Sequence, residues 1–356
     1  MFIKKIKLNH FRNYSKQEIN LKDGINVIYG DNAAGKTNII EAVFLCAIGK
    51  SFRTNKDKEL IQFKNEKAMV EIEYEKKDRN ADIKFEIEDK KSIFLNQIKL
   101  NKLSELIGNL NVVLFSPDDI EILKDGPSKR RKFLNILISQ LRPNYIYLLN
   151  SYLKTLEQRN HYLRQIKLEN KDEDLLDIWD EKLANTGKEI FEYRKEFIEK
   201  IKKKIKEIHK KIAAEETIKI KYNSDLEKEY LEKLKESRKG DIQKGFTQYG
   251  IHKDDFTIWI NEKQVNIYGS QGQHRTAILS LKLSELEIVY DEVGEYPILL
   301  LDDFMSELDE SRRNSLIKSI EKCQVIITCT DKIILENINY TLYKVENGEV
   351  QENGKI

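Results

Sequence analysis

Residues 30–37 read GDNAAGKT and carry the clearest chemical signature in the chain. They match G-x-x-x-x-G-K-[ST] at every fixed position, which is the spacing of a phosphate-binding loop. Two glycines let the backbone curl so that several N–H groups point at one anion. A helix that begins directly after the loop would aim its positive dipole end at the same anion. We therefore expect a nucleotide to bind here.

In such a loop, both the backbone N–H groups and the side chains are expected to bind ATP and Mg²⁺. Lys36 is expected to reach the β- and γ-phosphates, and the Thr37 hydroxyl to bind the magnesium ion. An apolar run over 25–29 predicts a strand before the loop, and apolar residues at helical spacing over 39–48 predict a helix after it. These flanks favour a phosphate loop over a glycine-rich turn that matches by chance. The candidate nucleotide ligands here are Gly30, Asp31, Asn32, Ala33, Ala34, Gly35, Lys36 and Thr37.

A second segment supplies the carboxylates that such a site needs. Residues 297–301 read PILLL, which predicts a buried strand, and Asp302 and Asp303 follow directly. Asp302 is expected to hold the magnesium ion together with Thr37. Asp303 is placed to polarise the attacking water as a general base. With Lys36, these two acids are the candidate catalytic residues.

Residues 268–276, YGSQGQHRT, lie between the other two motifs in the sequence and open a predicted helix. They resemble the S-G-G-Q signature of ABC-type ATPases, so Ser270, Gly272 and Gln273 are further candidate nucleotide ligands. In that superfamily the segment contacts the γ-phosphate bound by the other protomer, and ATP thereby joins two heads. The alternative is a Gly/Ser turn that only caps a helix.

The periodicity of the remaining sequence predicts an α/β protein. Alternating apolar residues predict two or three strands over 1–29 and an antiparallel meander over 68–100. The last third returns to strands and helices and ends in a predicted hairpin over 340–350, around Asn347 and Gly348.

A charged helical segment separates these two α/β parts. Its isoleucines over 198–212 are spaced three and four apart, which indicates a short coiled-coil-like hairpin. The loop and the acidic strand end serve one magnesium ion, so the two α/β parts should share a sheet. We therefore expect a discontinuous ATPase lobe, 1–118 with 241–356, and an inserted helical lobe, 119–240.

Composition narrows the class of protein but not the partner. The 356 residues include 62 Lys plus Arg and 60 Asp plus Glu, so any basic surface must be local. Three cysteines lie in apolar stretches without metal-ligand spacing, which indicates reduced thiols and a cytoplasmic protein. No apolar run approaches the ~18 residues of a membrane span, so no membrane partner is expected. Lysines also interrupt the first residues, where a signal peptide needs an apolar core.

Several unusual segments resemble the RecF family of bacterial recombination and repair ATPases, which are relatives of the SMC heads. Besides the motifs above, they are NHFRNY from residue 9, KSFRT from 50, FSPDDIEILKDGPSKRRKFLN from 115, LEQRN from 156, WDEKL from 179, GIHKDD from 250 and LLLDDFMSELD from 299. The likeness runs almost end to end. It implies an ABC/SMC-type P-loop ATPase head: a mixed sheet with flanking helices, the antiparallel meander, and the helical lobe inserted.

The resemblance also implies a function. It suggests a DNA-binding ATPase of gap repair and replication that dimerises with ATP, prefers gapped DNA or single/double-strand junctions, and works with RecR and RecO to place recombinase on gaps. Arg12 and Asn13 occupy the place where SMC-type heads touch phosphate, so they too are candidate ligands. Asp303 stands where the usual catalytic residue is Glu, and Thr330 where ABC ATPases usually carry His. These departures favour a slow switch over fast hydrolysis.

Two other functions are compatible with a nucleotide site. One is the nucleotide subunit of an ABC transporter, against which stand the missing His, the meander and the helical insertion. The other is a nuclease with an ABC head, which would need an additional acidic metal cluster, and we expect no room for such a domain after the last strand.

Two further motifs remain open. The basic cluster Lys129, Arg130, Arg131 and Lys132 is either a contact for DNA phosphates or the solvated face of a helix. For the lysines of 198–212, interleaved with glutamates, we favour a solvated face. We expect the turn at His252 and Asp254 to be a structural corner without chemistry.

Overall fold

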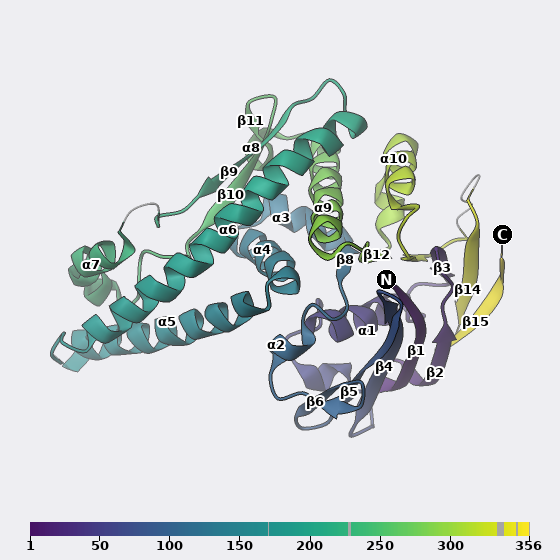
Figure 1. The fold of residues 1–356 in the computed structure, drawn as a ribbon, viewed down its shortest axis with the longest axis horizontal. Coiled ribbons are helices and arrows are strands. Elements are labelled where there is room, and N and C mark those ends of the chain that lie inside the picture. The colour runs from purple at the N-terminus through teal and green to yellow at the C-terminus, as the bar shows by residue number, and fades with distance from the viewer. Residues whose placement is uncertain (170, 227–228, 333–337, 347, 356) are drawn as a thin grey trace. The chain divides into compact units, whose positions relative to one another are not determined.

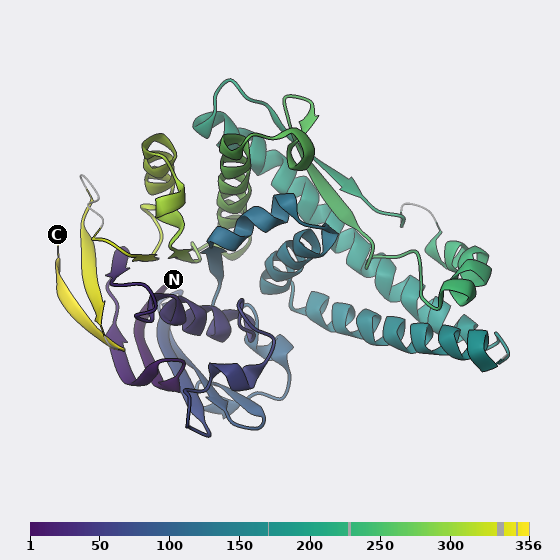
Figure 2. The ribbon, with the colours of Figure 1, turned by 180° about the vertical axis from the view of Figure 1, so that it is seen from behind.

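The protein is described from a computed structural model that covers residues 1–169, 171–226, 229–332, 338–346 and 348–355. The chain divides into two compact units, whose elements are drawn in Figures 1 and 2. Unit 1 comprises Met1–Ile120, Glu207–Glu215 and Arg275–Ile356. Unit 2 comprises Glu121–Lys206 and Glu216–His274. No described helix is long and apolar enough to cross a membrane.

Unit 1 contains an antiparallel sheet with strand order β2-β1-β4-β5-β6-β7. Along β4, every second side chain from Ala68 to Tyr74 is buried, as expected for a sheet with one face on the core. The sheet includes the meander predicted over 68–100, which is confirmed. Its strands are β1 Phe2–Phe11, β2 Tyr14–Asn20, β4 Ala68–Lys76, β5 Arg79–Ile87, β6 Lys91–Leu95 and β7 Ile98–Lys99.

The second sheet of unit 1 is mixed, with order β15-β14-β3-β13-β12-β8. All neighbours from β14 to β8 are parallel, and only β15 runs antiparallel to its neighbour. The central strands β12 and β13 are buried along their whole length, as parallel strands covered on both faces must be. The strands are β3 Ile25–Tyr29, β8 Val112–Phe115, β12 Ile298–Asp302, β13 Val325–Cys329, β14 Tyr340–Glu346 and β15 Glu349–Lys355. Asn347 of the predicted hairpin turn lies outside the described residues, but its two strands do pair.

Helix α1, Lys36–Ile48, packs between the two sheets of unit 1. It contacts β13, β12 and β8 of the mixed sheet, and β4 and β5 of the antiparallel sheet. A helix covered on both sides must be apolar nearly all round, and α1 has no amphipathic stripe. Glu41 is the one acidic residue within it, and its side chain is completely buried.

The rest of unit 1 is helical or carries short turns. The elements are η1 Asp57–Leu60, α2 Leu103–Leu106, η2 Pro117–Ile120, the part of α9 from Arg275, η3 Phe304–Glu307 and α10 Glu310–Ile320. All three cysteines of the chain, Cys46, Cys323 and Cys329, belong to this unit, and all three are buried free thiols. Burial raises the pKa of Cys46, and raises that of Cys323 to about 12.

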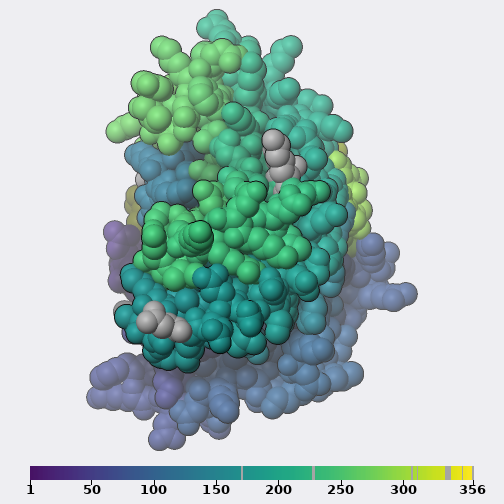
Figure 3. All heavy atoms as spheres, turned by 90° about the vertical axis from the view of Figure 1, so that its left-hand side faces the viewer, coloured from purple at the N-terminus to yellow at the C-terminus, as the bar shows by residue number. Residues whose placement is uncertain are grey.

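Unit 2 is mainly helical, with one small antiparallel sheet of order β11-β10-β9. Figure 3 shows a face of this unit on which residues of α7, in green, adjoin the teal residues of the long helices. Tyr162, Leu163, Ile166 and Leu176 form a buried cluster between α5 and α6. The elements are α3 Glu121–Lys124, α4 Pro127–Leu141, α5 Pro143–Glu169, α6 Leu176–Ile212, β9 Ile218–Asn223, α7 Tyr230–Lys244, β10 Asp255–Ile260, β11 Lys263–Gln264 and α8 Val265–Tyr268. Helix α9 spans Gln271–Val293, and only its first residues, up to His274, belong to unit 2.

The isoleucine seam of α6 is buried only in part. Ile198, Ile201 and Ile205 are completely buried, but Ile208 is not, and the imidazole of His209 takes the buried place beside it. The His209 Nδ1 atom lies 2.9 Å from the Ser280 hydroxyl. The buried part of the seam therefore ends at Ile205, about two turns before the last isoleucine of the predicted pattern, Ile212.

Unit 2 also extends beyond the predicted helical lobe of 119–240. Residues 241–274, which we expected in the ATPase lobe, are grouped with unit 2 instead. The physical reason is pairing: β10 lies along the whole length of β9, and the Asp241 carboxylate bonds Arg159 of α5. Conversely, Glu207–Glu215, which comprises the end of α6 and the three residues after it, is grouped with unit 1.

Candidate nucleotide site

The loop at residues 30–37 leaves the end of β3 and runs directly into α1. Gly35, at φ 118°, precedes the first helical residue, Lys36. A Cβ atom built on Gly35 would lie 2.4 Å from the Asn13 side chain, and one built on Gly30 would lie 2.2 Å from the Val345 carbonyl oxygen. Both positions therefore require glycine, because any side chain would collide with neighbours that fix the loop.

The Lys36 side chain folds back into the loop. Its Nζ atom donates to the carbonyl oxygens of Gly30, at 2.7 Å, and Asp31, at 2.9 Å. The residue is only 4% exposed, so its charge is held inside the curl of backbone. An ammonium group in such a place is preorganised for an anion that the surrounding N–H groups also attract.

Thr37 and Asp302 meet, although 265 positions separate them in sequence. The Thr37 hydroxyl donates to Asp302 Oδ1 at 2.9 Å. Because β12 and β3 are parallel strands of one sheet, their carboxyl ends lie at the same edge, which brings the acid to the loop. Burial raises the pKa of Asp302, and hydrogen bonds from Thr328 and Thr37 partly offset that effect.

Asp303 follows Asp302 in a left-handed backbone conformation, with φ 48°. A non-glycine residue at positive φ is uncommon and costs free energy, and such strain often occurs at functional sites. The Asp303 N–H donates to the Thr328 hydroxyl at 3.0 Å, so a bond from β13 supports this conformation. Thr328 was not among the residues that the sequence singled out, because a threonine in a strand reads as an ordinary β-former.

Asn13 joins the loop to the N-terminal strands. Its Nδ2 donates to the Ala34 carbonyl oxygen at 2.7 Å, and its Oδ1 accepts from Asn38 of α1 at 2.7 Å. Of the two N-terminal candidates, Asn13 therefore contacts the loop itself and holds its last turn against α1.

Arg12 contacts α1 rather than the loop. Its Nε and Nη2 atoms bond the two carboxylate oxygens of Glu41 at 2.8 and 2.6 Å, and its Nη1 bonds the Glu59 carbonyl oxygen. Arg53 also donates to the Glu41 carboxylate, at 3.4 Å, and to the Asn38 side-chain oxygen, at 2.9 Å. A direct contact between Arg12 and phosphate stays a prediction. Sequence reasoning missed Glu41, although a lone acid in an apolar helix is itself a signal.

The loop and the acids fit a magnesium nucleotide by their donor set. A hydroxyl oxygen and a carboxylate oxygen are the hard ligands that Mg²⁺ prefers, and Mg²⁺ commonly takes only one or two protein ligands beside the nucleotide phosphates. Among the described residues, no group of three or more His, Cys, Asp or Glu side chains is arranged to hold a metal by itself.

Comparison with known proteins identifies the family. The sequence profile of the RecF/RecN/SMC N terminal domain matches residues 2–353. The DNA replication and repair protein RecF of Clostridioides difficile strain 630 is 41% identical over 99% of this chain and 100% of its own length. The chain belongs to the RecF family.

Solved structures agree with this assignment. A structure of the recombination mediator protein RecF with ATP, in the RecFOR pathway, has a TM-score of 0.93 and 40% identity, and the match covers 99% of this chain and 98% of that one. An Smc head bound to the C-winged helix domain of ScpA is 17% identical, has a TM-score of 0.60, and covers 100% of this chain and 98% of its own. The second likeness concerns the fold alone. The expected ABC/SMC-type fold class is confirmed.

The segment that resembles the ABC signature belongs to unit 2, whereas the loop and the acids of this RecF-family chain belong to unit 1. Ser270 and Gln273 cap α9 reciprocally: the Ser270 N–H donates to the Gln273 side chain at 3.1 Å, and the Gln273 N–H donates to the Ser270 hydroxyl at 3.2 Å. Gln273 also bonds Glu216. The cap accounts for the residue types of this segment without assigning a ligand, so nucleotide contacts by Ser270, Gly272 and Gln273 stay predictions.

In the basic cluster of α4, which the sequence left open, Arg130 and Arg131 make contacts within the fold. Arg130 is buried, and its Nε and Nη2 bond the two carboxylate oxygens of Asp255 at 2.5 and 3.0 Å. Arg131 donates to the Asp254 carbonyl oxygen at 2.8 Å. These guanidinium groups fix α4 to β10, so their removal would disturb the fold before it changed contacts with a nucleic acid.

The turn at 250–255 is the corner expected from the sequence, and the structure shows what it ties together. The buried Asp254 carboxylate accepts hydrogen bonds from Arg194 of α6, Tyr222 of β9 and Ser224. His252 contacts the Tyr152 hydroxyl through Nδ1 at 2.9 Å and the Thr247 carbonyl oxygen through Nε2 at 3.0 Å.

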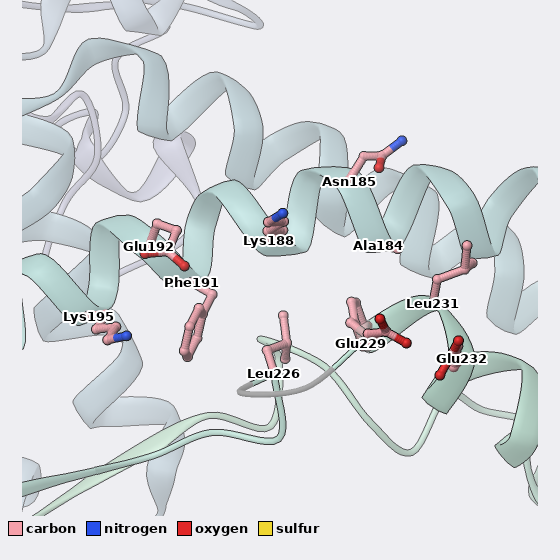
Figure 4. Close-up of a pocket in the computed structure, with 11 residues that line it drawn as sticks. Ala184, Asn185, Lys188, Phe191, Glu192, Lys195, Leu226, Glu229, Leu231 and Glu232 are labelled. Atoms are coloured by element: carbon pink, nitrogen blue, oxygen red, sulfur yellow. The ribbon is translucent and has the colours of Figure 1, made fainter.

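Unit 2 also has a pocket of about 800 Å³ between one face of α6 and the start of α7. Lys188, Phe191 and Lys195 line it from α6, and Glu229 and Glu232 from the other side (Figure 4). Lysines and glutamates mix on its walls, so it lacks the converging positive charge of a phosphate site.

Proposed function

We propose that this chain is an ATP-dependent DNA-binding protein of recombinational gap repair and replication-fork maintenance. The observation that carries the proposal is the bond between Thr37 and Asp302 beside the buried Lys36, which assembles the magnesium and phosphate ligands of a P-loop ATPase. The 40% identity to a RecF solved with ATP supports the same ligand here. The gapped-DNA and RecO and RecR parts rest on family membership.

In the proposed site the residues divide into binding, positioning and proton-handling groups. The loop N–H groups and Lys36 would hold the phosphates, while the Thr37 hydroxyl and Asp302 would hold Mg²⁺. When bound, the metal ion supplies charge neutralisation to the phosphates. Asp303 would orient the attacking water and accept its proton, and Asn13 would keep the loop closed against α1.

Slow hydrolysis suits a switch better than a pump. The carboxylate of Asp303 is one methylene shorter than the usual Glu, and its backbone is held at φ 48°. Thr330 stands in place of the usual His and is exposed. ATP would therefore stay bound long enough to hold two copies together on gapped or junction DNA, where the RecO and RecR proteins act with RecF relatives.

Sedimentation velocity with DNA tests this function. With ATP or a non-hydrolysed analogue and Mg²⁺, we expect the protein to sediment as a dimer that co-migrates with gapped DNA. With ADP, we expect a monomer that binds the same DNA weakly. Blunt duplex and single-stranded DNA of equal length serve as controls for the preference. A monomer with every nucleotide, or equal DNA binding with ATP and ADP, would remove the proposed switch.

A further inference from the structure

Thr328 is a buried hydroxyl in a strand that is otherwise apolar. Strand β13 reads VIITC, and all five residues are buried. Thr328 is completely buried and is the register partner of Asp302 on the neighbouring strand β12. A valine has nearly the same shape and no hydroxyl to desolvate, so the hydroxyl must be compensated by the bonds it makes.

The Thr328 hydroxyl donates a hydrogen bond to one acid of the site and accepts one from the backbone of the other. Its proton goes to Asp302 Oδ1, at 2.8 Å. Its oxygen accepts the backbone N–H of Asp303, at 3.0 Å. One hydroxyl therefore fixes the side chain of the first acid and the strained backbone that aims the second, which lies at φ 48°.

Asp302 is consequently held from two different elements. Thr37 donates to Oδ1 from α1 at 2.9 Å, and Thr328 donates to the same oxygen from β13 at 2.8 Å. Two donors on one oxygen fix the orientation of the carboxylate and so the direction of its other oxygen. A carboxylate that binds a metal loses affinity when its supporting hydrogen bonds are removed, typically by about 10- to 100-fold.

We propose that Thr328 is a positioning residue. Its hydroxyl, placed by the register of β12 and β13, orients the Asp302 carboxylate to bind Mg²⁺ and holds the Asp303 backbone so that its carboxylate can reach the attacking water. It touches neither metal nor nucleotide itself. The inference rests on the proposed magnesium-nucleotide function and adds a residue that the loop and acid motifs do not contain.

The test separates magnesium binding from nucleotide binding. Calorimetric titrations with ATP, in EDTA and at graded Mg²⁺, would compare the wild type with Thr328→Val and Thr328→Ser. For Thr328→Val we expect unchanged affinity for ATP in EDTA, but about a tenfold rise in the Mg²⁺ concentration that gives half of the magnesium effect. Thr328→Ser keeps the hydroxyl and should stay within about twofold of the wild type.

A matched control is Thr341→Val, because Thr341 is buried in β14, with β3 separating that strand from β13. It should leave the Mg²⁺ dependence unchanged. If Thr328→Val does not fold, Thr328→Ala and Thr328→Ser form the test pair, since they differ by one oxygen atom. A Thr328→Val or Thr328→Ala protein with the wild-type Mg²⁺ dependence would overturn the role of Thr328. A wild type that binds no ATP would instead overturn the proposed function itself.

Discussion

At the scale of single residues, two charged side chains of the candidate site, Lys36 and Asp302, are already held in place by hydrogen bonds. The ammonium group of Lys36 sits between two carbonyl oxygens of its own loop, so little conformational freedom remains to be lost when a phosphate binds. Asp302 is likewise oriented by two hydroxyl groups. At Asp303 the structure shows a backbone held at φ 48° and bonded through its N–H to the Thr328 hydroxyl.

These different surroundings predict different defects for Lys36→Ala and Asp303→Asn. Loss of the Lys36 charge should weaken ATP binding on the order of 100-fold, because charge-assisted hydrogen bonds contribute about 1.5–3 kcal/mol each. Asp303→Asn should bind ATP normally and hydrolyse it about 10²- to 10⁴-fold more slowly, since a general base contributes about that factor. ATP titration and phosphate release measure the two quantities separately. Wild-type turnover by Asp303→Asn would mean that another group activates the water.

The residues that carry chemistry could be predicted from the sequence where they form a fixed pattern. The loop, Asp302 and Asp303 could be predicted from their spacing and from the apolar strands that precede them. Thr328 and Glu41 could not be found in this way, because their roles depend on which strand or side chain lies opposite. The contacts of Arg130 and Arg131 could not be predicted for the same reason, because a basic run has the same sequence whether it faces solvent or a carboxylate such as Asp255.

At the scale of elements, buried ion pairs join the helices of unit 2 in addition to their apolar packing. Arg159 of α5 bonds Asp180 of α6 at 2.6 Å and Asp241 of α7 at 2.7 Å, and all three side chains are completely buried. Arg194 of α6 bonds Asp254, the Ile251 carbonyl oxygen and Tyr145. Helix periodicity predicted the helices themselves, but such pairs join residues far apart in sequence and leave no periodic mark.

Arg194→Met should therefore destabilise unit 2 by about 3–5 kcal/mol, because it leaves the Asp254 carboxylate buried without its cation. Both tryptophans, Trp179 and Trp259, lie in unit 2, so urea unfolding followed by tryptophan fluorescence reports on this unit. The control is Lys202→Ala, which removes only a surface pair with Glu199 and should change the free energy of unfolding by less than about 1 kcal/mol. Equal midpoints for the two variants would contradict the structural role of Arg194.

His252 should make the stability of unit 2 depend on pH. Burial lowers its pKa from 6.5 to about 4, so between these values the unfolded chain binds a proton that the folded unit does not. The free energy of unfolding should fall as the pH drops from 6.5 towards 4, by at most about 3 kcal/mol from this group. Unfolding titrations at several pH values would show a shallower slope for His252→Gln. An identical slope would assign the pH dependence to other groups.

At the scale of the whole molecule, the motifs proposed to contact nucleotide fall into two compact units. The loop and acids belong to unit 1, and the capped segment with Ser270 belongs to unit 2. In an ABC-type dimer the two kinds of motif come from different protomers, so each unit would complete a site on a second copy. The sequence analysis instead placed all of these motifs in one lobe, because the pairing of β9 with β10, which groups residues 241–274 with unit 2, leaves no mark in the sequence.

Ser270→Arg should abolish ATP-dependent dimerisation and leave ATP binding by the monomer nearly unchanged. The longer, charged side chain would stand where the segment must meet the nucleotide of the other copy. Ser270→Ala is the matched control, because it removes the same helix cap, at a cost of about 1 kcal/mol, without adding bulk. Sedimentation with ATP compares the two. A Ser270→Arg protein that still dimerises would place the interface elsewhere.

The distribution of the thiols gives a way to observe unit 1 by itself. Cys46, Cys323 and Cys329 are buried in that unit, and a thiol reacts only as an exposed thiolate. Alkylation under native conditions therefore requires unit 1 to open, and its rate measures how often opening occurs. ATP that binds only the closed form should slow the reaction by the factor 1 + [ATP]/Kd. The alkylation rate of these native cysteines would therefore report how much of the protein has ATP bound, without an added label.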